Sequence, residues 1–269
     1  KTASNNGIRP ILYKFFKNND LQEIIPADFY QKLKETYYYN LARNTKLFEA
    51  LKEILHEFNK HNIDVILLKG AYLAPFVYKD IGLREMSDLD LLVREEQLHE
   101  AVDIVKSLGY KHLPFRSKWH EKHYFDLNKH WPALRKESVS VDLHWFLVNI
   151  NNKDELNRKI FEKIELQEIE GCIFKALSPE IFLLHIVSHI IYHEQINQYF
   201  FRSYYDAALW LHLCKDQLSR EALNKYDQDY FQVPGLEEYV SHLVALFQIN
   251  EDRFTLQKEN SSIEIAEKL

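Results

Sequence analysis

The chain is poor in glycine and proline, with only 6 and 7 among 269 residues. Both residue types mark turns, so their scarcity predicts few turns and long helices and disfavours a β-sandwich. Its 2 cysteines, Cys172 and Cys214, form neither a CxxC pair nor a disulfide framework, which indicates a reducing compartment and a cytoplasmic location. No apolar run of about 18 residues exists, so we expect no membrane-spanning helix. The first residues, KTASNNGIRP, lack the apolar core of a signal peptide.

Positive charge is also in deficit, because 34 Lys and Arg stand against 40 Asp and Glu, giving a net charge of −6. A large nucleic-acid footprint needs many cations facing phosphates, so long nucleic acids are disfavoured as partners. A short RNA end in a local basic pocket is not excluded. Hydrophobic residues (46%) and aromatic residues (14%) are abundant, and they suffice for a sizeable core in one large or two modest domains.

The hydrophobic pattern predicts an N-terminal helical segment, residues 1–59. Helix is expected over residues 20–60, where apolar side chains recur every 3.6 residues or so from Leu47 to Phe58. Asn44 or Thr45 is the expected N-cap, since short polar side chains accept hydrogen bonds from the first free N–H groups.

Residues 60–150 alternate between short apolar runs and amphipathic segments, which predicts a small mixed sheet with flanking helices. We expect strands at 63–68, 87–93, 122–127 and 139–148. After residue 150 the strand pattern fades, and residues 151–269 are expected to form a mainly helical C-terminal domain in which Ser178 caps one helix. The predicted fold class is therefore α/β (α+β), a sheet domain packed against a helical lobe.

Two acids interrupt the second expected strand, in the stretch REMSDLDLLV. Residues i and i+2 of a strand point to one face, about 6.6 Å apart, so Asp88 and Asp90 aim their carboxylates the same way. Two such charges repel unless a cation lies between them, and Mg²⁺ prefers hard oxygen ligands. Asp142 interrupts another apolar strand, which could lie beside the first. Three carboxylates on adjacent strands can hold the metals used for in-line phosphoryl or nucleotidyl displacement.

A possible phosphate site precedes the acids, at the exit of the first strand in VILLKGAYL. A strand–turn–helix arrangement exposes backbone N–H groups, and Gly70 would let the backbone approach a phosphate closely. Lys69 and Arg84 could supply countercharge, although Arg84 could instead be a structural partner of the aspartates. Ser87 could contact a ligand or cap the turn. The spacing is not that of a Walker loop, and no GxGxxG occurs.

The block LLKGAYLAPFVYKDIGLREMSDLDLLVREEQLHEAVDIVKSLGY, residues 67–110, resembles the uncharacterised nucleotidyltransferase family of the polymerase-β-like superfamily. Its LKG turn followed by RxxxDxDLLV and a helix is the specific part of the resemblance. The segment VDLHW is similar to the family's later strand bearing the third acid. The segment FFRSYYDAALWL, with Arg202 and Asp206, is similar to an RxxxD helix in its C-terminal part. The resemblance covers roughly residues 30–215.

The resemblance implies a sheet of nucleotidyltransferase type and a metal-dependent enzyme that moves a nucleoside monophosphate from a triphosphate such as ATP to an acceptor. Asp88 and Asp90 would bind Mg²⁺ or Mn²⁺, Asp142 would help activate the acceptor hydroxyl, and Gly70 would face the triphosphate. The acceptor stays open among small molecules, proteins and RNA ends. Gly70 is followed by Ala71, where the wider superfamily usually has a serine that contacts phosphate. This departure favours, weakly, a catalytically inactive nucleotide- or partner-binding module.

Histidines form a second group of candidates, in LLHIVSHIIYHEQ. His185, His189 and His193 fall along one stripe of the expected helix. The stripe could be polar without a metal, could line a cleft and touch substrate, or could bind zinc in a hydrolase, although no HExxH motif is present.

Three further residues have two interpretations each. His144 lies two residues after Asp142 and could touch substrate or be a core histidine. Arg202 and Asp206 could contact substrate, but their spacing is that of an i, i+4 ion pair on one helix.

Overall fold

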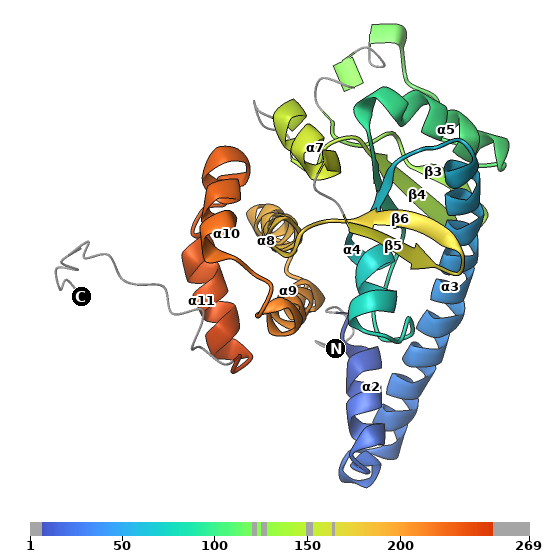
Figure 1. The fold of residues 1–269 in the computed structure, drawn as a ribbon. Coiled ribbons are helices and arrows are strands. Elements are labelled where there is room, and N and C mark those ends of the chain that lie inside the picture. Colours follow the sequence, from blue (N-terminus) through green and yellow to red (C-terminus); the bar gives the residue numbers. More distant parts are fainter. Residues whose placement is uncertain (1–6, 120–122, 125–127, 149–152, 163–164, 250–269) are drawn as a thin grey trace.

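The computed structural model describes residues 7–119, 123–124, 128–148, 153–162 and 165–249. Within these residues a six-stranded mixed sheet lies between the N-terminal helices and a C-terminal group of helices (Figure 1). The expected α/β class is thus confirmed. None of the helices in the described ranges combines the length and the apolar character needed to cross a membrane.

The sheet has the strand order β3-β4-β2-β1-β6-β5. The strands are β1 (Val65–Leu67), β2 (Leu89–Val93), β3 (Leu134–Lys136), β4 (Val139–His144), β5 (Glu165–Ile169) and β6 (Cys172–Ala176). β1 is antiparallel to β2 and parallel to β6, while β2 is parallel to β4. Because β1 and β2 are central and fully buried, their sequences are apolar except for Asp90.

The described helices are α2 (Arg9–Asn18), α3 (Ala27–Lys60), α4 (Lys69–Tyr72), α5 (Leu98–Ser107), α7 (Lys153–Glu162), α8 (Pro179–Gln195), α9 (Phe201–Cys214), α10 (Arg220–Tyr226) and α11 (Leu236–Leu246). Short 3₁₀ turns span Gln22–Ile24 and Glu95–Gln97, and π-helical turns span Leu73–Val77 and Asp227–Phe231. The helices α8 and α9 pack on each other and stand beside α4 (Figure 1).

Local patterns predicted most of the central elements. Strands β1, β2 and β4 lie inside three of the expected ranges, and the Ser178 hydroxyl accepts a hydrogen bond from the backbone N–H of Ile181 at 3.4 Å, which confirms it as the N-cap of α8. The strand expected at 122–127 lies largely outside the described residues, and His123 and Tyr124 within it are helical.

The N-cap predicted at Asn44 or Thr45 is wrong, because α3 runs unbroken through both positions. The Asn44 side-chain amide donates to the carbonyl of Arg84 at 2.8 Å, and Asn40, one turn earlier, donates to the carbonyl of Gly82 at 2.7 Å. Both asparagines are buried, so α3 uses them to hold the segment that leads into β2.

The hairpin of β5 and β6 was not predicted, because its sequence is charged and its strands are short. β5 is an edge strand that is mostly exposed, and β6 pairs with β1 through Ile66 and Lys175. The turn residues Glu170 and Gly171 have φ angles of 48° and 83°, as a two-residue hairpin turn requires. This Glu-Gly pair was the available signal, and the sheet extends past residue 150 because of the hairpin.

Candidate functional site

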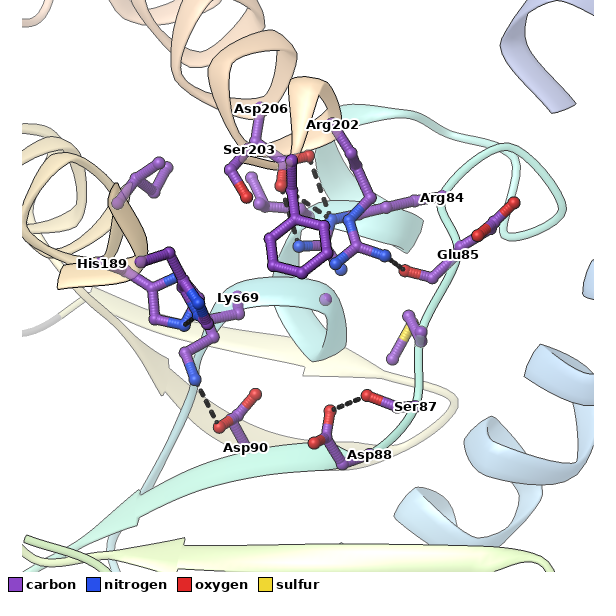
Figure 2. Close-up of a pocket in the computed structure, with 16 residues that line it drawn as sticks. Lys69, Arg84, Glu85, Ser87, Asp88, Asp90, His189, Arg202, Ser203 and Asp206 are labelled. Carbon is purple, nitrogen blue, oxygen red and sulfur yellow. Dashed lines mark hydrogen bonds and ion pairs between the residues drawn. The ribbon is translucent and has the colours of Figure 1, made fainter. Parts of the chain in front are cut away.

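The parallel register of β2 and β4 brings two of the predicted acids together. Asp90 is the direct partner of Asp142, so their Cα atoms are on neighbouring strands, which lie about 4.8 Å apart, and their side chains are on one face. Asp88 immediately precedes β2, and Figure 2 shows its carboxylate and that of Asp90 directed into the same pocket.

Asp90 is 4% exposed and has two close partners. The Lys69 ammonium lies 2.8 Å from its Oδ1 atom, and the Nε2 atom of His144 lies 2.9 Å from the same oxygen. Burial opposes the negative charge, but Lys69 and His144 outweigh burial and hold the pKa of Asp90 well below its usual range. Asp90 is therefore an ionised carboxylate with its charge already balanced.

His144 is buried, as expected of a core histidine, and its hydrogen-bond partner is Asp90. Burial lowers the pKa of His144 to about 4, against the opposing effect of Asp90, so the imidazole is neutral at physiological pH. A neutral ring that faces a carboxylate through Nε2 donates from that atom. The Nδ1 atom is then an acceptor, and it is buried without a hydrogen-bond partner.

Lys69 reaches Asp90 from the turn between β1 and α4. Its φ angle of 42° is in the left-handed region, which is uncommon for a residue with a side chain. Such strain costs on the order of 1–3 kcal/mol and persists where the surroundings fix the conformation, often at functional sites. In Lys69 this backbone conformation accompanies an ammonium group that points at Asp90 (Figure 2).

Asp88 and Asp142 carry charge that the protein does not balance. Burial, followed by the charges of Asp90 and Asp88, raises the pKa of Asp142 to about 6. Burial and Asp90 likewise raise the pKa of Asp88, although the Ser87 hydroxyl donates to its Oδ1 atom at 3.0 Å. The Oδ1 atom of Asp142 is buried, and none of the residues that the structure describes forms a hydrogen bond with it.

The carboxylate oxygens of Asp88, Asp90 and Asp142 are the candidate ligands of the expected divalent cation. In the part of the chain that the structure describes, no three side chains of His, Cys, Asp or Glu are already gathered as a metal site. The unpartnered oxygen of Asp142 and the raised pKa values of Asp88 and Asp142 nevertheless indicate excess negative charge on hard oxygen donors. That chemistry fits Mg²⁺ or Mn²⁺.

Gly70 is required by packing as well as being placed at the pocket. A Cβ atom on this residue would lie 2.3 Å from Nη1 of Arg84 and 2.8 Å from Cγ of Met86. The backbone N–H of Ala71 donates to the carbonyl of Leu68 at 3.1 Å, so that amide is already used. The close approach of Gly70 to phosphate stays a prediction.

Arg84 pairs with Asp206 of α9, and not with the aspartates of β2. Its Nη2 atom lies 2.8 Å from Oδ2 of Asp206, and its Nε atom lies 3.0 Å from Oδ1. The Tyr78 hydroxyl also donates to this carboxylate at 2.7 Å. The i, i+4 ion pair predicted between Arg202 and Asp206 is therefore wrong, because Asp206 is saturated by other donors.

Arg202 instead holds the segment before β2, since its Nη1 atom donates to the carbonyl of Glu85 at 2.8 Å (Figure 2). Burial and the neighbouring Arg84 lower its pKa. Its Nε atom is buried and has no hydrogen-bond partner among the described residues, so Arg202 keeps capacity to bind an anion.

Two cavities adjoin the acid cluster and share the wall formed by Lys69, Asp90 and His189. The smaller, of about 270 Å³, is also lined by the predicted nucleotide-binding residues Gly70, Arg84 and Ser87, by the predicted metal ligand Asp88, and by Arg202 and Asp206. The larger, of about 670 Å³, is also lined by Lys129, His130, Asp142, His144 and His185. Asp90 thus lies at the boundary between two separate spaces.

The histidine stripe of α8 lines this cleft. His185 lines the larger cavity, His193 lines the smaller one, and His189 lines both, so the three do not converge on one point. The Nε2 atoms of His189 and His193 lie 3.1 Å apart. Burial lowers the pKa of His189 to about 2 and that of His185 well below its usual value, so both rings are neutral.

Sequence reasoning missed Lys129, which comes from an irregular segment without a strand or helix pattern. Its ammonium donates to the carbonyl of Leu147 at 3.1 Å. Burial, and next the charge of Lys69, lowers the pKa of Lys129 to about 8. Nothing in the local sequence NKHW distinguishes this lysine from a solvated one.

The family model of the uncharacterised nucleotidyltransferases matches residues 1–240. The chain belongs to this family. The match confirms the resemblance carried by the LKG and DxD blocks, and it makes the chain a nucleotidyltransferase by family. A search of curated proteins found no significant match.

Three solved structures show a distant likeness, each with a TM-score of 0.44. The solution structure of the antibiotic-resistance factor ANT(2'')-Ia is 15% identical, with coverage of 74% of this chain and 98% of that one. ANT(2'')-Ia in complex with adenylyl-2''-tobramycin is 13% identical, with coverage of 76% and 99%. An antigenic nucleotidyltransferase-like protein from Paracoccidioides brasiliensis is 16% identical, with coverage of 80% and 92%. No substrate is inferred from likenesses this distant.

Proposed function

We propose that this nucleotidyltransferase is metal-dependent and transfers a nucleoside monophosphate from a triphosphate such as ATP to a hydroxyl acceptor. The observation that carries the proposal is the pairing of Asp90 with Asp142 on neighbouring strands, with Asp88 directly before β2, where two cavities adjoin. One cavity serves each substrate, and the acids lie where the substrates meet.

The triphosphate binds in the smaller cavity. Arg84 is neutralised there by Asp206, but Arg202 has no carboxylate partner among the described residues, and its Nε atom is free to donate. Lys69 lies at the shared wall and adds a second cation beside Asp90. Arginine and lysine in a partly closed site stabilise phosphoryl oxygens as charge develops on them.

The acceptor hydroxyl approaches from the larger cavity, where Asp142 takes its proton. A carboxylate whose pKa is about 6 is a stronger base than an ordinary aspartate and is still ionised at neutral pH. The acceptor oxygen attacks the α-phosphorus in line with the departing pyrophosphate, so one P–O bond forms as another breaks. Mg²⁺ or Mn²⁺, held by Asp88, Asp90 and Asp142, would supply charge neutralisation at the phosphates.

The test is transfer of label from nucleoside triphosphates labelled on the α-phosphate to cell extract, with Mg²⁺ or Mn²⁺. We expect Asp142→Asn to lower transfer by about 10²–10⁴-fold, the usual contribution of a positioned base. Asp88→Asn should also abolish labelling. The matched control is Asp103→Asn, because Asp103 is 80% exposed on α5 and remote from both cavities. Labelling by both site variants at the level of the control would refute the mechanism.

The alternative is a module that binds a nucleotide or a partner without turnover. It is favoured by Ala71, which offers no hydroxyl and whose N–H is bound to Leu68. Calorimetric titration with a triphosphate and Mg²⁺, beside an assay for released pyrophosphate, separates the two functions. Tight binding without pyrophosphate release in any extract would favour the module.

A further inference from the structure

The larger cavity is lined by a cation, Lys129, that forms no ion pair with the residues that the structure describes. Among the described residues that line it, Asp90 is balanced by Lys69 and His144, and Asp142 belongs to the metal site. Lys129 forms no ion pair within the described ranges and donates only to the carbonyl of Leu147. With a pKa of about 8 it stays mostly charged at neutral pH. A half-buried ammonium group of this kind is stabilised by an anion.

Three polar atoms around the same cavity have no hydrogen-bond partner among the described residues. They are Oδ1 of Asp142, Nδ1 of His144 and Nε2 of His185. His144 and His185 are 3% and 2% exposed, so neither ring is freely solvated. Leaving such buried groups unsatisfied is unfavourable, and hydroxyl groups of a ligand can both donate to and accept from such atoms.

The volume and the charge of the cavity limit what can occupy it. About 670 Å³ lies within the range of roughly 300–1,000 Å³ that is typical of small-molecule sites. A polycation would meet Lys69 and Lys129 and would find no unengaged carboxylate in the described lining except Asp142. The lining therefore disfavours polycationic acceptors.

We propose that the acceptor is a compact polyhydroxylated molecule with one anionic group, which binds in the larger cavity with that group at Lys129. The inference rests on the proposed function, because it assigns the larger cavity to the acceptor. The hydroxyl groups of the acceptor satisfy His185 and His144 and present one oxygen to Asp142.

The test is a charge series on a single ring, using glucose 6-phosphate, glucose and glucosamine. Each is titrated calorimetrically into the full chain with Mg²⁺ and a non-hydrolysable ATP analogue, which blocks the smaller cavity. We expect glucose 6-phosphate to bind tightest and glucosamine weakest. Inorganic phosphate, titrated in the same way, should bind weakly at Lys129.

The variants isolate the contribution of Lys129. Lys129→Gln should weaken the binding of glucose 6-phosphate by about tenfold or more and leave the affinity for glucose unchanged. Lys129→Arg should keep the order of affinities of the three ligands. Lys118→Gln, at an exposed position, removes the same charge and should change nothing. Unfolding temperatures of the variants confirm that each is folded.

Three results would overturn the inference: tighter binding of glucosamine than of glucose 6-phosphate, equal effects of Lys129→Gln and Lys118→Gln, or no binding of either glucose 6-phosphate or phosphate. The proposed function can be refuted independently of this inference. Binding of glucose 6-phosphate at Lys129 without any label transfer would leave the anion site standing and refute transfer. Label transfer to a polycationic acceptor would support the function and refute this acceptor class.

Discussion

Asp88 and Asp90 are two residues apart in the chain, yet their surroundings act on them in opposite directions. From the sequence, two neighbouring charges should repel, and replacing either with asparagine could raise stability. In the structure Lys69 and His144 favour the ionised form of Asp90, whose pKa is lowered. Asp88 lacks such partners, and its pKa is raised. The repulsion between the two carboxylates therefore leaves a raised pKa only at Asp88.

We therefore predict opposite effects on thermal stability in metal-free buffer at neutral pH. Asp90→Asn should lower the unfolding temperature by several degrees, because Lys69 loses its buried counter-charge and His144 loses a charged hydrogen-bond acceptor. Asp88→Asn should raise the unfolding temperature slightly, because it removes the charge that burial and Asp90 disfavour. Scanning calorimetry of both variants against the unaltered chain measures the difference.

The pH dependence of these two effects follows from the directions of the pKa shifts. The stabilising contribution of Asp90 is present above its unfolded pKa and is lost as pH falls through the lowered folded value. The gain from Asp88→Asn is present above the raised folded pKa of Asp88 and fades as pH falls and the native side chain takes up its proton. Changes of the unfolding temperature that have the same sign and size in both variants at neutral pH would contradict this account.

At the scale of elements, the long helix α3 positions the approach to β2. Asn40 and Asn44 face inwards and bind the carbonyls of Gly82 and Arg84. These carbonyls belong to an irregular segment that would otherwise bury unsatisfied groups. The segment carries Arg84 to its partner and leads directly to Asp88, so α3 contributes to the site without lining either cavity.

We expect Asn44→Ala to lower the free energy of unfolding by about 1–3 kcal/mol, because it leaves buried carbonyl groups without donors. Label transfer should fall as well, since the segment before Asp88 loosens. Thr45→Ala is the control, because the Thr45 hydroxyl is exposed and binds only the carbonyl of Leu41 in its own helix. If urea unfolding gives the same free energy of unfolding for Asn44→Ala and Thr45→Ala, the contacts of Asn44 are dispensable.

At the scale of the whole molecule, one buried ion pair joins the segment before β2 to the helical part. The side chains of Arg84 and Asp206 are 8% and 3% exposed, and Asp206 also accepts from Tyr78. Gly70 makes room for the guanidinium group. The pair therefore fixes α9 against the turn that carries Lys69.

Removing one partner of this pair should be more damaging than removing both. Asp206→Ala leaves a buried guanidinium unpaired and should lower the free energy of unfolding by about 3–5 kcal/mol. Arg84→Met combined with Asp206→Leu replaces the pair by apolar groups and should cost less than Asp206→Ala alone. A double-mutant cycle in urea measures the coupling, and additive effects of the single changes would mean that the pair is not coupled.

The local sequence by itself determined the central strands β1, β2 and β4 and the cap of α8, and it predicted that Asp90 and Asp142 lie on neighbouring strands. These features depend on side-chain periodicity and on neighbours in the chain, which the sequence displays directly. The β5–β6 hairpin was not predicted, because its strands are short, charged and stabilised chiefly by pairing with β1.

Only the tertiary structure decided how the acids are charged and what surrounds them. Lys69, His144 and Asp206 meet their partners across 21, 54 and 122 residues of chain, respectively. Spacing in the sequence carries no record of such contacts, because chain folding and not local geometry brings the partners together. The same applies to Lys129, whose lowered pKa arises from burial beside Lys69.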